Sequence, residues 1–358
     1  MKILHIINSL HTGGAEKLVV DTLPLFEEKG ITVDLALLNA HKTPFYEKLM
    51  QNFKGKVYGF SRGSVYNPMH IFRLMPLLKK YDVIHAHLFP VQYFLVLAKI
   101  LSFSRVKLIF TEHSTSNRRL QNPRLRWVER FIYQYYAKII CITEEVKKQL
   151  KINLQIPDNQ LQVINNGINI EEINRQEKYS RVDFNFSSED KLLIMVAGFR
   201  REKDQDTVIK CLKILPDNYK LILVGDGERR SDLEKLVYDQ QLGKRVFFFG
   251  LRRDVIALIK MCDVAILSSH WEGFGLAAAE AMACGIPTIA SDVEGLNKVV
   301  EDGGILFERG NVEDLKEKIL SLNNIEYYVM ISGRGKNKAS KYNIYSLINK
   351  QVNLYKNI

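Results

Sequence analysis

Short apolar runs alternate with longer amphipathic stretches along this chain. The run Lys2–Ile7 is followed by a helix-like stretch over Ala15–Lys29 and then by the apolar run Thr32–Leu38. Runs of the same character recur at Asp82–His85, Val106–Phe110, Lys138–Ile142, Leu192–Ala197, Lys220–Val224, Val246–Phe249, Asp263–Leu267 and Thr288–Ala290. Buried strands separated by helix-length segments predict βαβ units and parallel sheets, so the expected fold class is α/β.

The alternation breaks once, between residues 168 and 190. This stretch is polar and charged, and no long apolar period runs through it. We therefore predict two doubly wound, Rossmann-like domains, at 1–168 and 191–337, joined by a linker at 169–190. Two domains also fit a length of 358 residues, at about 150 residues per domain. We expect residues 338–358 to form a C-terminal helix that packs back on the N-terminal domain.

Composition narrows the class of protein. The hydrophobic fraction of 46% and the charged fraction of 25% are ordinary for a globular protein. No stretch reaches the 18 or so apolar residues of a membrane-spanning helix, and the N-terminus lacks the features of a signal peptide. We therefore expect a cytoplasmic protein. The cysteines are scattered along the chain, so we expect them to be reduced, buried thiols rather than zinc ligands. They are Cys141, Cys211, Cys262 and Cys284.

The net charge of +11 is concentrated in the first half of the chain. Residues 1–180 hold 25 Lys and Arg against 15 Asp and Glu, whereas residues 181–358 hold 26 against 25. A basic half favours an anionic partner: a nucleic acid, a phospholipid surface or a phosphorylated substrate. Nucleic acid is disfavoured because no DNA- or RNA-binding motif is present.

The segment Arg118–Arg130 carries much of this positive charge. Aromatic residues interleave with its arginines, and Glu129 is its one acid. Such a segment suits an anionic membrane surface. A solvated, partly packed helix is the alternative. We therefore expect the protein to work at the inner face of the cell membrane. The arginines concerned are Arg118, Arg119, Arg124, Arg126 and Arg130.

Two glycine turns follow predicted strands. Gly13 and Gly14 come after the first strand, where glycine lets the backbone approach a phosphate at a helix N-terminus. Their spacing is not GxGxxG, and the second strand ends without an acid that could bind a ribose, so a nicotinamide cofactor is disfavoured. A tight turn without a ligand is the alternative. The second turn, Val224–Glu228, has only a GxG pattern and is weak evidence for any ligand.

Cations cluster after the first strand of the second half, at Arg200, Arg201 and Lys203. The carboxyl ends of parallel strands are where α/β proteins bind ligands, and Arg and Lys are suited to phosphate. A solvated charged loop is the alternative. The acids that follow, Asp204 and Asp206, resemble a metal-binding DxD pair, but we expect them in the first turn of a helix, where acids suit the helix dipole.

A glycine-rich turn and an Ala-rich helix lie at Glu272–Gly285. Glu272 lies in the turn, and Glu280 lies about a turn and a half into the helix. Helix-terminal amides between them suit an anion, and a carboxylate can accept two hydrogen bonds from a vicinal diol. One acid could therefore hold a sugar and the other a ribose, with a diphosphate between them. A surface Glu and a helix Glu without a ligand are the alternative.

This last motif resembles the EX7E signature of the family-4 retaining nucleotide-sugar glycosyltransferases. The resemblance extends over nearly the whole chain and implies the GT-B fold, in which two Rossmann-like domains face each other across a cleft. Individually most of the matching segments are weak, whereas their order and spacing together are specific. They are Thr12–Glu16, Asp82–His87, Thr111–His113, Cys141–Glu145, Val163–Asn169 and Phe199–Lys203.

The resemblance also implies roles for individual residues. Arg200 and Lys203 would bind the donor diphosphate, Glu280 the ribose diol, and Glu272 the transferred sugar. The catalytic residues that it implies are His113, Glu272, Arg200 and Lys203. The donor-binding residues that it implies are Gly13, Gly14, Arg200, Lys203, Gly250, Leu251, Glu272, Gly273, Phe274, Gly275, Leu276 and Glu280. The chain departs from the family pattern at Gly198, where many members have Arg, and at Asn169, where the pattern has Asp.

The implied reaction moves a sugar, with retention, from a UDP- or GDP-sugar to a hydroxyl of a glycan or lipid-linked acceptor in cell-envelope polysaccharide biosynthesis. Neither a metal nor a cofactor is implied, and the leaving phosphate would accept the acceptor's proton. Two alternatives remain. A sugar-nucleotide epimerase of the same fold would need a different acid/base set and no acceptor, and a non-catalytic module would bind the nucleotide sugar without releasing nucleoside diphosphate.

Overall fold

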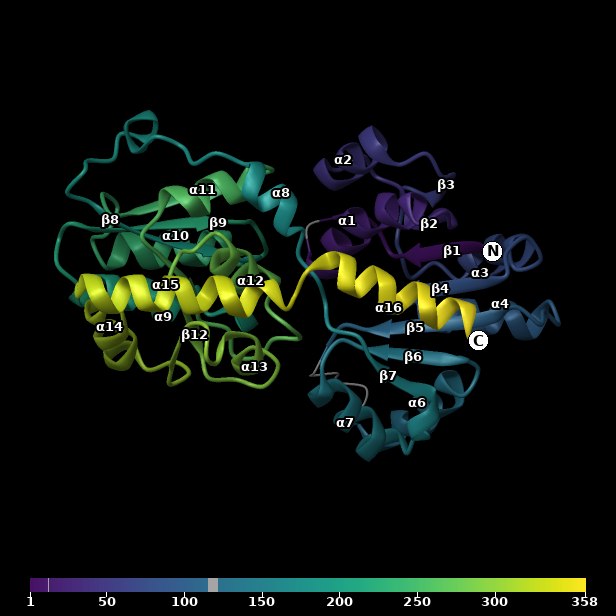
Figure 1. Ribbon diagram of the computed structural model, residues 1–358. Helices are drawn as coiled ribbons and strands as arrows, with labels where there is room; N and C mark the ends of the chain where they lie inside the picture. Colours follow the sequence, from purple (N-terminus) through teal and green to yellow (C-terminus); the bar gives the residue numbers. More distant parts are fainter. Residues whose placement is uncertain (12, 115–121) are drawn as a thin grey trace. The chain divides into compact units, whose positions relative to one another are not determined.

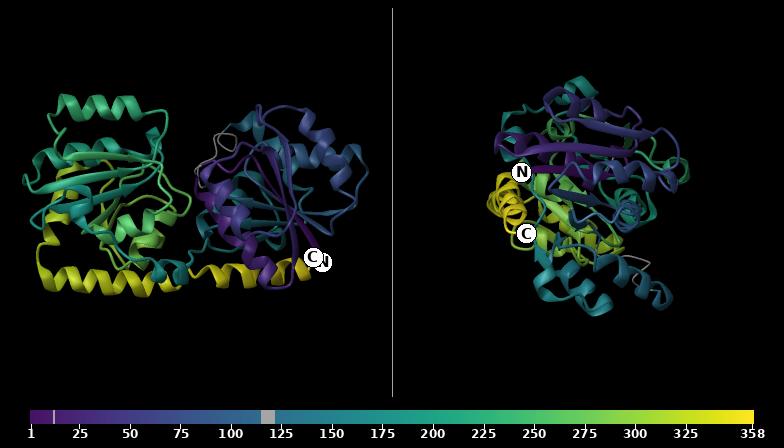
Figure 2. Two further views of the ribbon diagram at one scale, coloured as in Figure 1. Left: turned by 90° about the horizontal axis from the view of Figure 1, so that it is seen from above. Right: turned by 90° about the vertical axis from the view of Figure 1, so that its right-hand side faces the viewer.

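The computed structural model describes residues 1–11, 13–114 and 122–358. The chain forms two compact units (Figure 1), and it passes between them twice. Unit 1 consists of Met1–Gly167 together with Ile344–Ile358, and unit 2 consists of Ile168–Asn343. Each unit is a parallel sheet flanked by helices (Figure 2), which confirms the predicted α/β class and the two Rossmann-like domains.

Unit 1 contains a seven-stranded sheet of order β3-β2-β1-β4-β5-β6-β7. Its strands are β1 (Lys2–Ile7), β2 (Thr32–Asn39), β3 (Val57–Ser61), β4 (Val83–His87), β5 (Lys107–Glu112), β6 (Lys138–Cys141) and β7 (Leu161–Val163). Its helices, with η for short 3-10 helices, are α1 (Gly14–Glu28), α2 (Pro44–Asn52), α3 (Met69–Leu74), η1 (Met75–Leu77), α4 (Val91–Leu101), α6 (Pro123–Tyr133), α7 (Glu144–Leu154), η2 (Asp158–Gln160) and α16 (Ile344–Lys356). The strand order reverses between β1 and β4.

Unit 2 contains a six-stranded sheet of order β10-β9-β8-β11-β12-β13. Its strands are β8 (Lys191–Val196), β9 (Tyr219–Val224), β10 (Val246–Gly250), β11 (Val264–Leu267), β12 (Thr288–Ser291) and β13 (Ile305–Phe307). Its helices are α8 (Ile170–Arg175), η3 (Arg181–Phe184), η4 (Arg201–Lys203), α9 (Gln205–Ile214), α10 (Arg230–Asp239), α11 (Val255–Met261), α12 (Leu276–Ala283), α13 (Asn297–Val300), α14 (Val312–Ser321) and α15 (Ile325–Ser340). Here the strand order reverses between β8 and β11.

The segment 169–190, for which the sequence pattern predicts a linker, makes specific contacts within unit 2. Lys260 Nζ donates to the carbonyl oxygens of Ile173 and Gln176, at 2.6 and 2.5 Å. Arg181 Nη2 lies 2.9 Å from Asp263 Oδ1. Polar contacts and a few isolated buried apolar residues, such as Ile173 and Phe186, therefore attach this segment to the unit, and such attachment leaves no long apolar period in the sequence.

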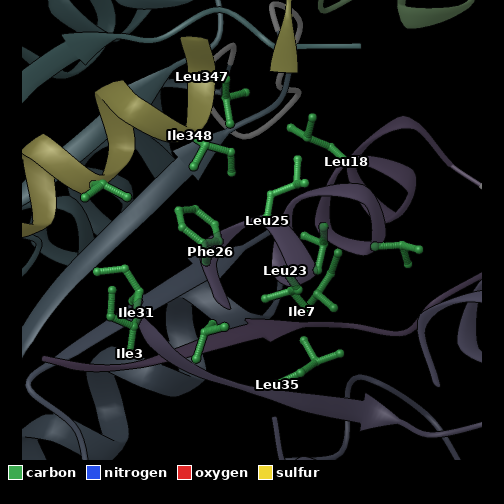
Figure 3. Packing of buried hydrophobic residues seen from close by; sticks show 14 of the residues in the cluster. Ile3, Ile7, Leu18, Leu23, Leu25, Phe26, Ile31, Leu35, Leu347 and Ile348 are labelled. Atoms are coloured by element: carbon green, nitrogen blue, oxygen red, sulfur yellow. The ribbon is translucent and has the colours of Figure 1, made fainter. Parts of the chain in front are cut away.

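The C-terminal residues 338–358 do not form one helix. Helix α15 ends at Ser340 within unit 2, and α16 begins at Ile344 within unit 1. Apolar residues of α16 belong to the core of unit 1, where Leu347 and Ile348 lie near Phe26 of α1 (Figure 3). The same core contains Ile3 and Ile7 of β1. Burial of this apolar stripe is the main source of the stability that α16 adds to unit 1.

The four cysteines form no disulfide. Cys141, Cys211 and Cys262 are buried, and Cys284 is partly buried. Burial raises the pKa of the Cys211 thiol to about 12, so this thiol is protonated and unreactive at neutral pH. The cysteines therefore serve as small apolar residues of the cores.

Candidate active site

The cationic segment and the Glu272 turn lie at the same edge of the unit 2 sheet. η4 follows β8, and the turn 268–275 follows β11. β8 and β11 are neighbouring parallel strands, and the strand order reverses between them. This reversal is the topological switch point at which open α/β sheets bind ligands.

Lys203 and Glu272 are in direct contact at this edge. Lys203 Nζ donates to Glu272 Oε2 at 2.5 Å, and the Ser269 hydroxyl donates to the same oxygen at 3.3 Å. Both side chains are only partly exposed, at 21% and 16%. The fold thus brings together two predicted site residues that are 69 positions apart in the sequence.

The backbone around this ion pair is fixed by buried hydrogen bonds. The Ser268 hydroxyl is within hydrogen-bond distance of the carbonyl oxygens of Lys203 and Asp204, at 3.1 and 2.7 Å. The backbone N–H of His270 donates to the carbonyl of Glu202 at 2.8 Å. These bonds connect the exits of β8 and β11, so η4 and the Glu272 turn are held in one arrangement.

Arg200 differs from Lys203 in its surroundings. Its side chain is 56% exposed, and its guanidinium lies 3.9 Å from Glu202 Oε1. The arginine is therefore at the same edge of the sheet but remains hydrated. A hydrated guanidinium interacts less strongly with a phosphate than a cation in a partly dehydrated site.

The GxG turn after β9 holds the Arg200 loop in place. A Cβ at Gly225, whose φ is +142°, would lie 2.0 Å from the carbonyl oxygen of Ala197. A Cβ at Gly227 would lie 2.6 Å from the carbonyl oxygen of Phe199. The backbone N–H of Phe199 also donates to the carbonyl of Asp226 at 3.0 Å. The two glycines therefore allow close contact between neighbouring strand exits.

Helix α12 begins beside the Lys203–Glu272 pair. Gly275 is its N-cap residue with φ +84°, and a Cβ there would lie 2.5 Å from Leu296 Cδ1. The first amides of α12, beginning at Leu276, have no acceptor within the helix and carry the positive end of its dipole. Gly273 precedes them, and Phe274 is buried with its ring edge-on to Tyr342 at 5.1 Å. Phe274 can therefore reach a ligand only through its backbone.

Glu280 lies one helical turn beyond this N-terminus and is 4% exposed. Gly250 and Leu251 lie at the end of β10, where the carbonyl of Gly250 accepts the N–H of Gly225 at 2.9 Å. Leu251 is half exposed. The predicted donor-binding residues of unit 2 therefore lie at strand ends, in the turns that follow strands, or in the first two turns of α12.

The acids Asp204 and Asp206 have structural partners. α9 begins at Gln205, and Asp206 in its first turn accepts two hydrogen bonds from Arg229, at 2.5 and 2.9 Å. Hydrogen bonding to Arg229 lowers the pKa of Asp206. Asp204 accepts a hydrogen bond from the Thr207 hydroxyl at 2.6 Å. Both contacts fit the predicted position at the start of a helix.

The predicted residues of unit 1 lie at the carboxyl edge of its own sheet. Gly13 caps α1, and a Cβ there would lie 2.2 Å from a carboxylate oxygen of Glu16; Gly14 is the first residue of α1. His113 follows β5, and its Nε2 lies 3.2 Å from His87 Nδ1. Burial lowers the pKa of His113 to about 4, so its imidazole is neutral at pH 7.

Three further histidines lie near His113, and the sequence alone indicates no role for them. His5 is in β1, and His85 and His87 are in β4; all are buried, and one nitrogen of each lies within 4.8 Å of the others. The parallel register pairs His5 with His85. The i, i+2 spacing of His85 and His87 places them on one face of a strand, but the pairing register that adds His5 cannot be read from the sequence.

Only part of the predicted basic segment can be placed, because Arg118 and Arg119 lie outside the described residues. Residues 123–130 of the segment belong to α6, where Trp127 is 70% exposed and Phe131 is 41% exposed. Glu129 is buried and accepts a hydrogen bond from the Tyr93 hydroxyl at 2.6 Å. Arg130 donates to the side-chain oxygen of Gln155 at 3.0 Å. In the parts of the chain described by the structure, no helix is both long and apolar enough to span a membrane.

The chain matches two protein families. Residues 176–343 match the glycosyl transferases of group 1, and residues 12–172 match glycosyltransferase family 4. Together the two matches include every strand of both sheets except β1. The protein belongs to the family-4 glycosyltransferases, which have the GT-B fold. The resemblance to this family and its fold, noted in the sequence, is thereby confirmed.

Relatives and solved structures agree with this assignment. An uncharacterized glycosyltransferase of Methanocaldococcus jannaschii is 35% identical over 60% of this chain, which spans 58% of that relative's length. A second relative, from Escherichia coli, is the UDP-Gal:alpha-D-GlcNAc-diphosphoundecaprenol alpha-1,3-galactosyltransferase. It is 26% identical over a match that covers 80% of this chain and 78% of the relative's length. The crystal structure of HepE from Anabaena, in complex with UDP and glucose, matches with a TM-score of 0.88 over both entire chains, at 20% identity. At this identity the last similarity supports the fold alone.

Proposed function

We propose that this protein is a retaining glycosyltransferase. It moves a sugar from a nucleotide diphosphate sugar to a hydroxyl of a glycan or lipid-linked acceptor, in cell-envelope polysaccharide biosynthesis, without a metal. The observation that carries this proposal is the Lys203–Glu272 contact at the switch point of unit 2, next to the first amides of α12. Cations and helix amides suit a diphosphate, and a carboxylate suits sugar hydroxyls.

In this proposal Lys203 and Glu272 exchange partners when the donor binds. Without a ligand, each side chain neutralises the charge of the other at 2.5 Å. The donor diphosphate would form an ion pair with the ammonium of Lys203 in place of Glu272. A hydroxyl of the transferred sugar would then donate a hydrogen bond to Glu272. The ion pair therefore limits the cost of holding two charges in a partly dehydrated site before the donor arrives.

The proposed group transfer takes place on one face of the sugar. The bond between the anomeric carbon and the diphosphate oxygen breaks, while the acceptor oxygen forms the new bond on the same face and its proton passes to the leaving phosphate. Negative charge grows on the diphosphate during this step. Lys203, Arg200 and the amides of Gly275 and Leu276 are the groups that we propose stabilise it. Glu280 holds the ribose diol, and His113 acts near the reacting carbon.

We propose a UDP-sugar as the donor to test first. HepE was crystallised with UDP, and the Escherichia coli relative is named for UDP-Gal and for an acceptor on diphosphoundecaprenol. These names support a uridine donor and a lipid-linked acceptor for this chain. A GDP-sugar is the alternative donor.

Nucleotide-dependent thermal stability tests the proposed function. At 100 times its Kd a ligand stabilises the folded state by about 2.7 kcal/mol, so saturating UDP should raise the Tm by at least about 2 °C. Uridine and NAD should leave the Tm unchanged. Glu280→Ala should abolish the UDP shift because the ribose loses its carboxylate partner. A shift with NAD alone would contradict the proposal.

The alternatives give different products with a UDP-sugar. A transferase releases UDP, and release accelerates when an acceptor is added. An epimerase converts the UDP-sugar to its epimer without any acceptor, and a binding module produces neither UDP nor epimer. Chromatography of the nucleotides after incubation separates these outcomes.

We also propose that the face carrying α6 meets an anionic membrane. A basic side chain near such a surface contributes about 1 kcal/mol, so removing four should reduce binding to anionic vesicles at least ~10-fold. The variant replaces Arg118, Arg119, Arg124 and Arg126 by Ala, and vesicle pelleting measures binding. The control replaces Lys178, Lys191, Lys235 and Lys244, which are exposed in unit 2, and removes the same charge. Equal pelleting of the two variants would contradict the proposal.

A further inference from the structure

A series of hydrogen-bonded buried side chains connects the C-terminal helix α16 to His113 within unit 1. The Tyr355 hydroxyl lies 3.4 Å from His5 Nε2. His5 Nδ1 lies 3.1 Å from His87 Nε2, and His87 Nδ1 lies 3.2 Å from His113 Nε2. We call Tyr355, His5, His87 and His113 the histidine chain.

His85 joins the same chain from the side. Its Nδ1 lies 2.7 Å from the Tyr355 hydroxyl, and its Nε2 lies 2.7 Å from the hydroxyl of Thr111 in β5. Both of its ring nitrogens therefore have a partner. The residues of the histidine chain come from β1, β4, the exit of β5 and α16. Four separate segments of unit 1 must therefore be in place for the histidine chain to form.

The imidazoles of this group are neutral at pH 7. Burial lowers the pKa of His5 to about 3 and that of His113 to about 4. Burial, followed by the proximity of the other histidines, lowers the pKa of His85 and His87 well below the ordinary value of 6.5. A neutral imidazole has one N–H donor and one nitrogen acceptor.

Proton positions along the chain are therefore linked. If His5 Nε2–H donates to Tyr355, then His5 Nδ1 must accept from His87 Nε2–H. His87 Nδ1 must in turn accept from His113 Nε2–H, which leaves the lone pair on His113 Nδ1. The opposite direction would place the proton of His113 on Nδ1.

The hydroxyl of Tyr355 decides between these two directions. It has a single proton, and it lies closer to His85 Nδ1, at 2.7 Å, than to His5 Nε2 or Gln351 Oε1, each at 3.4 Å. We take the shortest of these contacts, to His85, as the one in which the Tyr355 hydroxyl donates, because hydrogen bonds from hydroxyl donors are shorter on average than those from N–H donors. With Tyr355 donating to His85, its oxygen accepts from His5, and His85 Nε2–H donates to Thr111. In this arrangement each ring N–H faces an acceptor and each ring lone pair faces a donor, except the lone pair of His113 Nδ1, which remains available.

We propose that Tyr355, His5 and His87 are positioning residues that hold His113 as its Nε2–H tautomer, with Nδ1 left to accept a hydrogen bond from a sugar hydroxyl. The role of Nδ1 in sugar transfer rests on the proposed function, whereas the tautomer of His113 does not. The C-terminal helix thereby determines the chemistry that the imidazole after β5 can perform. A fixed tautomer matters because the wrong one presents a donor where an acceptor is needed.

A metal ion is the competing explanation for His5, His85 and His87. Zinc–nitrogen distances are about 2.0–2.1 Å, so the nitrogens of a tetrahedral zinc site lie close together. The candidate ring nitrogens of His5, His85 and His87, one from each, are separated by up to 4.8 Å. Both nitrogens of His5 and of His85 also have hydrogen-bond partners. The hydrogen-bonded chain therefore accounts for these histidines better than a metal site does.

Nitrogen-15 NMR of protein labelled at its eight histidines tests the proposal directly. Chemical shifts of the two ring nitrogens report both the tautomer and the charge, and His113→Gln identifies the signals of His113. At pH 7 the wild-type protein should show neutral His113 in the Nε2–H form. A charged His113 or the Nδ1–H form would overturn the proposal, and so would one equivalent of bound zinc measured by elemental mass spectrometry.

Variants test whether the chain fixes this tautomer. Tyr355→Phe removes only the hydroxyl and should convert the single form of His113 into a mixture of both tautomers. His5→Phe breaks the chain at a second point and preserves ring packing against Phe26, whose centroid lies 5.4 Å away. The matched control is Tyr136→Phe, which removes a buried hydroxyl that donates to the Gln92 carbonyl at 2.8 Å and should leave His113 unchanged. An unchanged single tautomer in both chain variants would overturn the proposal.

Kinetics connect the tautomer to the proposed reaction. Tyr355→Phe should lower kcat at least ~10-fold and leave KM for the donor within about 2-fold, whereas Tyr136→Phe should change neither. A wild-type protein with the expected tautomer but without any sugar transfer would refute the proposed function alone. Sugar transfer by a protein whose His113 is the Nδ1–H form would refute the tautomer proposal alone.

Discussion

Replacing Lys203 by Ala is expected to lower kcat for sugar transfer by about 10²–10³-fold. Removing one preorganised donor that stabilises transition-state charge costs roughly this much. Lys203 is suited to the role because it is only 21% exposed and is fixed to the exit of β11 through Ser268 and Glu272. Initial rates of nucleoside diphosphate release at saturating donor measure the effect.

Two further variants show whether this loss is specific. Lys235→Ala removes an exposed cation of α10 in the same unit and should leave kcat within about 2-fold. Arg200→Ala should have a smaller effect than Lys203→Ala, because the Arg200 side chain is 56% exposed. A Lys203→Ala enzyme with near-normal turnover would remove Lys203 from the catalytic residues.

Acidification from pH 7 to pH 5 is expected to lower the free energy of unfolding by several kcal/mol. His5, His85, His87 and His113 have pKa values depressed below 6.5 in the folded state, with burial as the largest cause. The unfolded chain therefore binds more protons than the folded chain once the pH falls below 6.5. Each neutral histidine of this group gives up about 2 kcal/mol of stability between pH 7 and pH 5.

The direction and the pH window follow from these shifts. The stabilisation is complete above the unfolded pKa near 6.5 and is lost as the pH falls toward the folded values, about 4 for His113 and about 3 for His5. Carboxylates contribute at lower pH, because the depressed pKa values of Asp21 and Asp206 lie below 3.8. The histidines should therefore dominate the loss between pH 6.5 and pH 5.

Urea unfolding at several pH values measures this dependence. His5→Phe should reduce the slope of unfolding free energy against pH by about 1.4 kcal/mol per pH unit near pH 5, which corresponds to one proton. Tyr136→Phe should lower stability at every pH with an unchanged slope, because it removes a hydrogen bond but no histidine. An equal slope in wild type and His5→Phe would show that His5 is protonated in the folded state.

The sequence pattern predicts all the inner strands and, of the four edge strands, only β10. β8 and β11 are buried on both faces and appear as nearly continuous apolar runs, and β1 and β4 are apolar apart from their histidines. The three strands that the pattern missed, β3, β7 and β13, each lie at an edge of a sheet. They are short and only partly buried, so nothing in their composition separates them from loops.

In the candidate site, too, the sequence predicts the individual residues but not the contacts between residues that lie far apart in the sequence. Lys203 and Glu272 are recognisable in the sequence because each belongs to a motif that directly follows a strand. Their contact depends on β8 and β11 being neighbours, which the sheet order decides. The histidine chain could not be predicted for a similar reason, since Tyr355 lies 350 residues from His5 and reaches it only because α16 belongs to unit 1.

The central claim is that unit 2 binds the diphosphate of a nucleotide sugar through Lys203 and the first amides of α12. Calorimetric titration of UDP and of uridine into the wild-type protein and Lys203→Ala tests it most directly. The account predicts one site at which UDP binds at least ~100-fold more tightly than uridine, a difference of about 2.7 kcal/mol that Lys203→Ala largely removes. Equal affinities for UDP and uridine, or UDP binding that is unaffected by Lys203→Ala, would contradict it.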